Sequence, residues 1–347
     1  MKLATYKDGS RDGQLVLVSR DLSQAHYANG IATRLQQVLD DWNFLSPQLE
    51  ELYTTLNHGK ARHAFTFDPR LCMAPLPRAY QWLDGAAYLK HEALLHQARG
   101  AELPESLRRE PLIRQGGSDG FLGPCEPARF ASEAMGIDFE AEIAVITGDV
   151  ALGASPAQAL EGVRLLTLLN DWTLRSLEPA ELARGLGLLQ SKPGAAFAPV
   201  AVTPDELGQA WKGGRVHLSL QAQWNGRKVG QCETGPEMHF HFGELIAHIA
   251  KTRALRAGTL VGSGAVSSPE GSRGYASIVE KRALETLEQG EPRTEYMKFG
   301  DSLRLEIKGL DGQSLFGAID QDVVSLHEPL PELSPQSPPL DDAEATP

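Results

Sequence analysis

Acidic and apolar residues alternate in the segment Ile137-Asp138-Phe139-Glu140-Ala141-Glu142-Ile143-Ala144-Val145. The alternation predicts a β-strand, because successive side chains of a strand point to opposite faces. Asp138, Glu140 and Glu142 then share one face, and neighbours on that face are separated by roughly 6–7 Å. Carboxylates at this spacing can converge on one hard cation, whose oxygen ligands lie at about 2.0–2.6 Å. The commoner structure for such a segment is a half-exposed strand with its acids in solvent.

Three neighbouring like charges are costly without a counter-charge, so a metal site remains an open hypothesis beside the solvated strand. Asp171 is a second candidate ligand, because it ends the apolar segment 163–170, which predicts a buried strand. Taken alone, Asp171 is better explained as a turn-forming aspartate, and Asp84 is equally ambiguous. His91, seven residues after Asp84, is a candidate general base or a histidine on a helix surface.

The flanking sequence indicates an α+β fold. Residues 3–7 and 14–18 alternate on either side of a turn-rich segment, which predicts a β-hairpin. Helical spacing over residues 31–42 predicts one helix, and Pro47 is expected to open a second. Farther on, the pattern predicts strands at residues 137–147, 163–170, 216–224 and 303–307, a helix start at Ser155-Pro156, and helices at residues 242–249 and 278–287.

These elements divide the chain into two domains and a tail. Pro75 and Pro77 end a small α+β domain over residues 1–78, and a β-rich catalytic domain is expected over residues 79–327. Residues 328–347 carry five acids, no bases and six prolines, and removing them changes the net charge from −12 to −7. Such a segment has too few apolar groups to offset its ordering entropy, so we expect a disordered tail in preference to an ordered docking arm.

Composition restricts the class of protein. Of the 347 residues, 41% are hydrophobic and 22% are charged, as in a soluble globular chain. There is no run of about 18 apolar residues and no signal peptide, and three cysteines are widely spaced, so we expect a cytoplasmic protein without a membrane span. Acids outnumber bases 45 to 33 and no Lys/Arg cluster occurs, which argues against a nucleic-acid partner.

Two further motifs have simpler explanations than cofactor binding. His239-Phe240-His241 places two imidazoles on one face of a predicted strand, but no third ligand follows at a spacing familiar from zinc sites. A polar strand face is the expectation there. Gly262-Ser263-Gly264 lacks the helix-opening context of a phosphate loop and is expected to form a turn that lines a substrate pocket.

The order and spacing of the motifs together are more specific than any one of them. The motifs are Asp84 with His91, Asp138-Phe139-Glu140-Ala141-Glu142, Asn170-Asp171-Trp172, Gln190-Ser191-Lys192-Pro193, and Phe299-Gly300-Asp301-Ser302-Leu303-Arg304-Leu305-Glu306. In this combination the chain resembles the fumarylacetoacetate hydrolase family, from the first hairpin to about Asp322. The resemblance implies a small N-terminal domain followed by a mixed β-roll, usually assembled as a homodimer.

The resemblance also implies metal-dependent cleavage of a carbon–carbon bond in a 1,3-diketo acid, within the catabolism of aromatic compounds such as tyrosine. The ligands that it implies for Mg²⁺, Ca²⁺ or Mn²⁺ are Asp84, Glu140, Glu142 and Asp171, whereas Asp138 belongs to the motif without being a ligand. It implies catalytic roles for four residues: His91 as general base, Glu280 as the acid that orients it, and Lys192 and Arg175 as cations beside the substrate. The substrate-binding residues that it implies are Tyr88, Arg114, Gln190 and Ala265.

Three residues depart from the family pattern. Arg114 stands where relatives carry a tyrosine, Glu178 stands where well-studied members have glutamine, and Ala265 replaces a threonine. A guanidinium can form two hydrogen bonds with one carboxylate. Arg114 is therefore expected either to bind a second carboxylate of the substrate or to pair with Asp119 or Glu126.

Three functions stay open at this point. The first is hydrolysis of a diketo acid such as fumarylacetoacetate or an acylpyruvate. The second uses the same metal enolate for decarboxylation, isomerisation or tautomerisation of a 2-oxo acid, and the third is an inert homologue that binds a ligand or partner. His91 and Glu280 favour hydrolysis, because decarboxylation needs no activated water.

Overall fold

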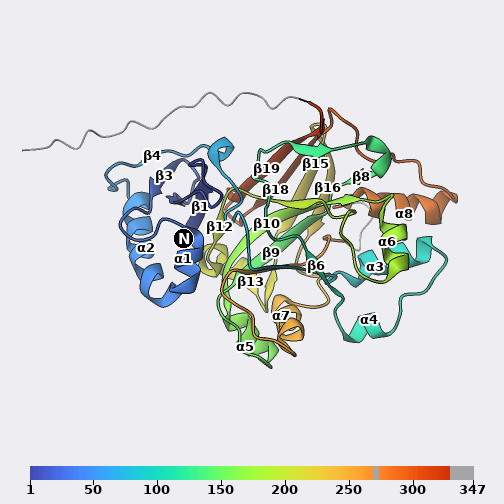
Figure 1. Ribbon diagram of the computed structural model, residues 1–347, viewed down its shortest axis with the longest axis horizontal. Coiled ribbons are helices and arrows are strands. Elements are labelled where there is room, and N and C mark those ends of the chain that lie inside the picture. The colour runs from blue at the N-terminus through green and yellow to red at the C-terminus, as the bar shows by residue number, and fades with distance from the viewer. Residues whose placement is uncertain (269–272, 329–347) are drawn as a thin grey trace, which may run out of the picture.

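A computed structural model describes residues 1–268 and 273–328. The tail predicted to be disordered, apart from Glu328, lies outside the described residues. Within them the fold is built on two main β-sheets and one short ribbon, with the N-terminal domain at one end of the molecule (Figure 1). The predicted α+β class, with a small N-terminal domain before a larger β-rich domain, is confirmed.

The larger sheet runs through both domains. From one edge to the other, the described strands are β4 (Phe65–Thr66), β3 (Gln24–Tyr27), β2 (Gln14–Val18), β1 (Lys2–Tyr6), β12 (Ala201–Val202), β10 (Val163–Leu174), β9 (Ala141–Thr147), β17 (Thr259–Gly262), β5 (Gln81–Gly85) and β6 (Ile113–Gly116), with β8 (Ile137–Asp138) and β11 (Gly194–Phe197) also paired to β10. The N-terminal strands join the rest through β1, where Lys2 pairs with Val202 and Leu3 with Ala201.

The second sheet covers one face of the first. Its described strands, in order, are β16 (Arg227–Glu233), β15 (Ser219–Trp224), β18 (Ser302–Lys308), β19 (Ser314–Ser325) and β7 (Ala128–Phe130), and the ribbon consists of β13 (Trp211–Lys212) and β14 (Arg215–Val216). One hydrophobic core joins residues of both sheets, among them Trp172 of β10, Leu305 of β18 and Ile319 of β19, all fully buried. This core holds the long central strand β10 rigidly in place.

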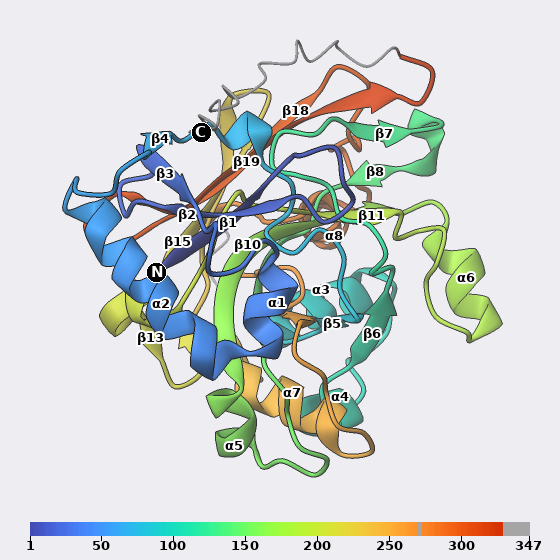
Figure 2. The same ribbon diagram turned by 60° about the vertical axis from the view of Figure 1, so that its left-hand side comes forward.

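The helices lie around the edges of the sheets. They are α1 (Leu35–Asp40), α2 (Trp42–Asn57), α3 (Leu89–Ala98), α4 (Ser106–Arg109), α5 (Pro156–Glu161), α6 (Glu178–Arg184), α7 (Phe242–Ala250) and α8 (Ile278–Gln289), with 3₁₀ turns at η1 (Pro69–Leu71), η2 (Glu133–Met135) and η3 (Pro204–Ala210). Figure 2 shows α1 and α2 in front of the first strands, and Figure 1 shows α3 and α6 toward the other end of the molecule. The helices α3 and α8 pack on each other.

One predicted helix boundary is wrong. Pro47 does not open a helix but lies inside α2, which begins at Trp42. A proline at this position removes the hydrogen bond to the carbonyl of Asn43. Both residues are exposed, so water can hydrate that carbonyl, and the burial of Leu49 and Tyr53 keeps the helix continuous.

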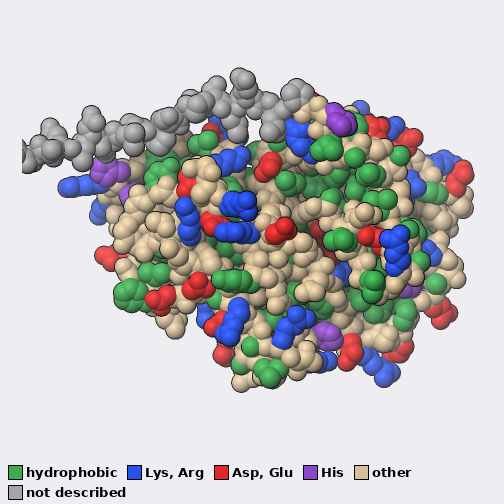
Figure 3. Space-filling view, viewed as in Figure 1, with side chains coloured by type: hydrophobic (Ala, Val, Ile, Leu, Met, Phe, Trp, Pro, Cys, Tyr) green, Lys and Arg blue, Asp and Glu red, His purple; other side chains and the backbone are tan. Residues whose placement is uncertain are grey.

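The surface shows no segregation of charge on the face drawn in Figure 3, where basic and acidic side chains of the described residues are interspersed. No helix among the described residues is long and apolar enough to cross a membrane.

Candidate metal centre and active site

Three acids from three strands meet at one point of the large sheet. Asp84 lies on β5, Glu142 on β9 and Asp171 on β10, and each offers an oxygen within 4.8 Å of the others. The strand between β5 and β9 carries Gly262 level with Asp84. A Cβ at Gly262 would lie 2.9 Å from Glu142 Oε2 and 2.4 Å from Trp82. The glycine therefore leaves the room that the Glu142 side chain occupies.

The three carboxyl groups are buried, with exposed fractions of 6% for Asp84, 0% for Glu142 and 3% for Asp171. Glu142 Oε2 accepts the N–H of Gly264 at 3.0 Å. Among the described residues, Asp84 Oδ1 and Glu142 Oε1 have no hydrogen-bond partner. Buried oxygens without partners are costly, and a divalent cation would satisfy both.

Burial and like charge act together on this cluster. Burial first, and then the neighbouring Asp171, raise the pKa of Asp84 to about 6. Burial, reinforced by Asp84 and Asp171, raises the pKa of Glu142 well above its ordinary value. Burial also raises the pKa of Asp171, with Lys192 opposing and Glu140 adding to the shift. Carboxyl groups whose pKa values are raised in this way are better explained by a cation-binding site than by a solvated surface.

Glu140 lies beside the cluster but is held by two cations. Its backbone carbonyl accepts the N–H of Asp171, so the two residues sit opposite each other on β10 and the segment before β9. Lys192 Nζ lies 2.6 Å from Glu140 Oε2 and 2.6 Å from Asp171 Oδ2, and it donates to Thr173 Oγ1 at 2.8 Å. Burial opposes ionisation of Glu140, yet Arg175 and Lys192 hold its pKa well below the ordinary value.

The guanidinium of Arg175 pairs with three acids. Its Nε donates to Asp138 Oδ2 at 2.8 Å and its Nη1 to Glu178 Oε1 at 3.0 Å, while Nη2 donates to Glu140 Oε1. Asp138 also accepts the N–H groups of Ile278 and Val279 at the start of α8. Asp138 therefore caps the N-terminus of α8 and lies outside the acid cluster. This placement agrees with the expectation that Asp138 is not a metal ligand.

Burial overturns one interpretation of the alternating segment. The exposed fractions are 0% for Asp138, 4% for Glu140 and 0% for Glu142, so the solvated strand face is wrong. The segment is also interrupted, since β8 ends at Asp138 and β9 begins at Ala141, although both pair with β10 in one register. Asp171 does not end its strand either, because β10 continues to Leu174 and pairs with β11 on its other side.

A histidine and a glutamate form a second buried group. His91 of α3 and Glu280 of α8 have exposed fractions of 6% and 2%, and His91 Nδ1 lies 3.2 Å from Glu280 Oε2. Ser267 donates to the other oxygen, Glu280 Oε1, at 2.9 Å. Burial favours the neutral ring, but the bond to Glu280 raises the pKa of His91 above its ordinary value. The alternatives of a surface histidine and an exposed helical acid are therefore wrong.

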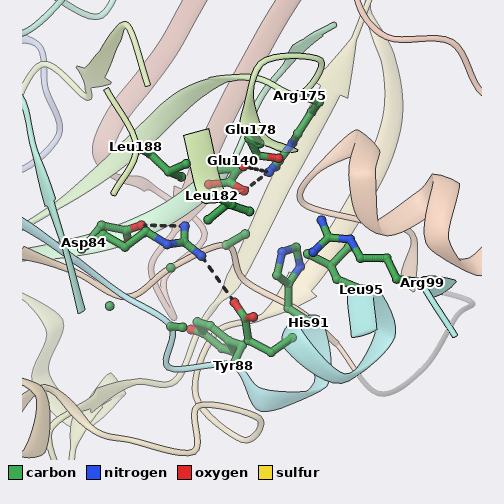
Figure 4. A pocket seen from close by; sticks show the side chains of 16 residues that line it. Asp84, Tyr88, His91, Leu95, Arg99, Glu140, Arg175, Glu178, Leu182 and Leu188 are labelled. Atoms are coloured by element: carbon green, nitrogen blue, oxygen red, sulfur yellow. Dashed lines mark hydrogen bonds and ion pairs between the residues drawn. The ribbon is translucent and has the colours of Figure 1, made fainter. Parts of the chain in front are cut away.

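One residue of each group, Asp84 and His91, lines the same cavity, shown in Figure 4. Residues that line it include Asp84, Tyr88, His91, Glu92, Leu95, Arg99, Arg114, Glu140, Arg175, Glu178, Leu182, Leu188, Gly264 and Ala265. Asp84, Arg114 and Leu188 also line a second cavity, together with Asp171 and Lys192. The two cavities therefore share three lining residues, one of them an acid of the cluster, while His91 lines the first cavity and Lys192 the second.

Arg114 belongs to this cavity and not to a surface ion pair. It lies on β6 opposite Asp84 in the sheet register. Its guanidinium is 3.7 Å from Asp84 Oδ2 and 3.7 Å from Glu92 Oε1, and its side chain is 32% exposed. Both contacts are too long for hydrogen bonds. The alternative pairing with Asp119 or Glu126 is not what the structure shows.

The other residues expected to bind substrate differ in their placement. Tyr88 and Ala265 line the cavity, but the Tyr88 hydroxyl already donates to the carbonyl of Thr234 at 2.7 Å. Gln190 is exposed and does not belong to the residues lining either cavity. Its backbone N–H donates to Glu181 instead, at 2.8 Å.

The two smaller motifs are explained by the fold. Gly264 has a left-handed φ of 74°, and the turn that it forms lines the cavity as predicted. Residues 239–241 form no strand in the described structure, which corrects the prediction of a polar strand face. His241 is instead the N-cap residue of α7, and its backbone N–H donates to Glu244.

Sequence reasoning missed several cavity residues. Leu95 and Arg99 follow His91 at intervals of four on α3, and residues four apart share one helix face. This helical spacing could have identified Leu95 and Arg99 as neighbours of His91 from the sequence. Glu92 had the same signal, because it lies next to His91 and four residues after Tyr88. Leu182 and Leu188 had none, because they reach the site from a segment far away in the chain.

Comparison with known proteins identifies the family of the chain. The model of the fumarylacetoacetase N-terminal domain 2 matches residues 1–78, and the model of the fumarylacetoacetate (FAA) hydrolase C-terminal domain matches residues 81–324. The chain belongs to the fumarylacetoacetate hydrolase family.

Three curated relatives align with part of the chain. An uncharacterized protein of Pyrococcus abyssi (strain GE5 / Orsay) is 29% identical over 51% of this chain and 76% of its own length. A 2,4-didehydro-3-deoxy-L-rhamnonate hydrolase of Sphingomonas sp. (strain SKA58) is 26% identical over 59% of this chain and 64% of its own length. A mitochondrial oxaloacetate tautomerase of Xenopus laevis is 26% identical over 62% and 59%.

Solved structures share the fold over nearly the whole chain. Maleylpyruvate hydrolase from Sphingobium sp. SYK-6, in complex with manganese(II) and pyruvate, superposes with a TM-score of 0.61 at 15% identity, covering 94% of this chain and 99% of that one. Fumarylacetoacetate hydrolase from Exiguobacterium antarcticum gives a TM-score of 0.62 at 16% identity, with the same coverage.

Proposed function

We propose that this protein is a divalent-metal-dependent hydrolase that cleaves a carbon–carbon bond in a 1,3-diketo acid. The observation that carries the proposal is one cavity whose lining includes Asp84, from the cluster with Glu142 and Asp171, and also His91, which is paired with Glu280. The metal hydrolase among the structural neighbours, and the hydrolase among the sequence relatives, support it. Fumarylacetoacetate and acylpyruvates are the proposed substrates.

The buried acids fit the cation that this chemistry needs. Asp84, Glu142 and Asp171 offer only oxygen donors, which suit Mg²⁺, Ca²⁺ or Mn²⁺, and two of those oxygens have no other described partner. Glu140 is proposed as the fourth ligand, although Lys192 and Arg175 hold its two oxygens in this structure. When bound, such a cation would polarise a carbonyl and stabilise an enolate leaving group.

The protein side chains supply the proton transfers. Glu280 holds Nδ1 of His91, which leaves Nε2 as the base that takes a proton from water. Lys192 and Arg175 bring two buried positive charges to the acid-rich site and are proposed to stabilise the oxyanion that forms. The cavity is mostly buried, so these charges act with little screening by solvent.

A tautomerase or isomerase acting on a 2-oxo acid is the second candidate. The similarity to an oxaloacetate tautomerase favours it, since such a reaction needs proton transfer without an attacking water. The two functions differ in their products: hydrolysis gives two acids, whereas tautomerisation gives one isomer. An inert homologue would give neither.

We also propose a homodimer, on the family resemblance alone, and light scattering in solution tests it.

Arg114 is expected to select substrates with a second carboxylate, because it lines the cavity without a hydrogen-bonded partner acid. Replacing it by tyrosine should lower kcat/KM for dicarboxylic substrates. The expected loss of transition-state stabilisation is roughly 1.5–3 kcal/mol, the range of a charged hydrogen bond. Monocarboxylic analogues should be affected much less. Steady-state kinetics on the two substrate classes make the test. Equal effects on both classes, or none on either, would assign Arg114 a purely structural role.

A further inference from the structure

Glu181 of α6 binds the segment that delivers Lys192 to the active site. Its carboxylate accepts the backbone N–H groups of three successive residues, Leu189 at 3.1 Å, Gln190 at 2.8 Å and Ser191 at 3.0 Å. The hydroxyl of Ser191 donates to the same group. The side chain is buried, although α6 itself is a short surface helix. One carboxylate thus fixes three consecutive peptide groups.

The residues that follow this attachment belong to the site. The carbonyl of Ser191 accepts the N–H of Leu174 at 2.8 Å, which fixes the segment to the end of β10. Lys192 comes next and bridges Glu140 and Asp171. On the other side, Leu188 lines both cavities. A displacement of residues 188–192 would therefore move the ammonium group and the cavity wall together.

Before Ser191, the segment lacks regular secondary structure and exposes most of its apolar side chains. Residues 185–193 form no helix or strand, and Gly185 and Gly187 have left-handed φ angles of 71° and 92°. Leu186 is 94% exposed and Leu189 is 78% exposed, so these apolar side chains contribute almost no burial. Hydrogen bonds to a charged acceptor are stronger than those to a neutral one. The contacts with Glu181 are accordingly the main attachment on this side of Lys192.

We infer that Glu181 is a positioning residue of this active site, which acts through residues 188–192 to place Lys192 between Glu140 and Asp171. It does not line either cavity and acts only through the segment that it binds. The kinetic part of the inference rests on the proposed function, whereas the placement of Lys192 does not.

Glu181→Gln is the informative change, because an amide keeps the volume and replaces one acceptor oxygen by a donor that opposes the backbone N–H groups. We expect kcat to fall about 100-fold, as when a group near the reacting atoms is misplaced by about 1 Å, with KM changed much less. Glu181→Asp keeps the charge and should recover part of kcat.

Glu285 offers a matched control. It lies on α8, and its carboxylate likewise accepts two backbone N–H groups, from Arg293 and Thr294, and the hydroxyl of Thr294. The loop that it holds lines neither cavity. Glu285→Gln should therefore destabilise the protein to a similar extent but leave kcat within a factor of two. Equal losses of kcat in the two variants would overturn the inference.

A second measurement does not depend on turnover. The side chain of Lys192 is 9% exposed, so its amine should react slowly with acetic anhydride, as followed by mass spectrometry of the digested protein. In Glu181→Gln we expect that rate to rise at least tenfold, and in Glu285→Gln to stay at the wild-type value. An unchanged rate in Glu181→Gln would refute the inference. If no protein, wild type included, cleaves a diketo acid, the proposed function fails while this rate still decides the role of Glu181.

Discussion

Replacing Glu142 by glutamine is expected to abolish hydrolysis and to remove the rise in melting temperature that a divalent cation gives the wild-type protein. The substitution deletes one charged ligand at constant volume from the point where three acids meet. A cation that binds the folded state stabilises it in proportion to the logarithm of its concentration over Kd, so loss of affinity appears directly as loss of that stabilisation. Thermal melts with and without Mg²⁺, Ca²⁺ and Mn²⁺ measure it.

The same substitution should leave the metal-free fold intact. The amide oxygen of glutamine can still accept the N–H of Gly264, and the change removes one of several like charges. The metal-free melting temperature should therefore be equal to or higher than that of the wild type. Glu285→Gln again serves as control, since it changes a buried glutamate away from the cluster. Normal turnover by Glu142→Gln would rule out the metal assignment.

Replacing His91 by alanine is expected to reduce hydrolysis by roughly 100- to 10,000-fold, the range for removal of a general base. The Nδ1 atom of His91 is bound to Glu280, and His91 does not belong to the group of three residues that could hold a metal ion. Metal affinity, measured by calorimetry, should therefore stay close to the wild-type value. The variant leaves Glu280 Oε2 without its histidine partner, so Glu280→Gln in the same background should restore stability but not activity.

Two outcomes would change this assignment. If calorimetry shows that His91→Ala has lost metal binding, the imidazole is a ligand and another residue must be the base. If the variant keeps full hydrolytic activity, the His91–Glu280 pair has a structural role only.

The local elements of the fold could be predicted from short-range sequence patterns. The alternation of residues 14–18 and 137–147, and the Ser155-Pro156 helix start, are short-range patterns, and the structure confirms a strand or helix at each. Pro47 was misplaced because the packing of Leu49 and Tyr53 outweighs the single hydrogen bond that proline removes. The boundary at Asp171 was wrong for a similar reason, since pairing of β10 on both sides extends the strand.

The chemistry of the site could be predicted from the sequence better than the residues that surround it. The acids Asp84, Glu142 and Asp171 were singled out in the sequence and meet in the structure. Their burial was not visible in the sequence, because the neighbouring cations come from other segments of the chain: Lys192 lies beside Asp171, and Arg114 lies beside Asp84. Glu181 has no distinguishing sequence signal, because its partners are mainly backbone N–H groups.

The most direct test of the central claim is a product assay on the purified protein, with and without a chelator. The substrates are fumarylacetoacetate and a panel of acylpyruvates, with oxaloacetate as the test for tautomerase activity. We expect two carboxylic acid products from at least one diketo acid, loss of that activity with the chelator, and its return when Mg²⁺, Ca²⁺ or Mn²⁺ is added. Isomerised substrate without cleavage, or cleavage that the chelator does not affect, would contradict a metal-dependent carbon–carbon hydrolase.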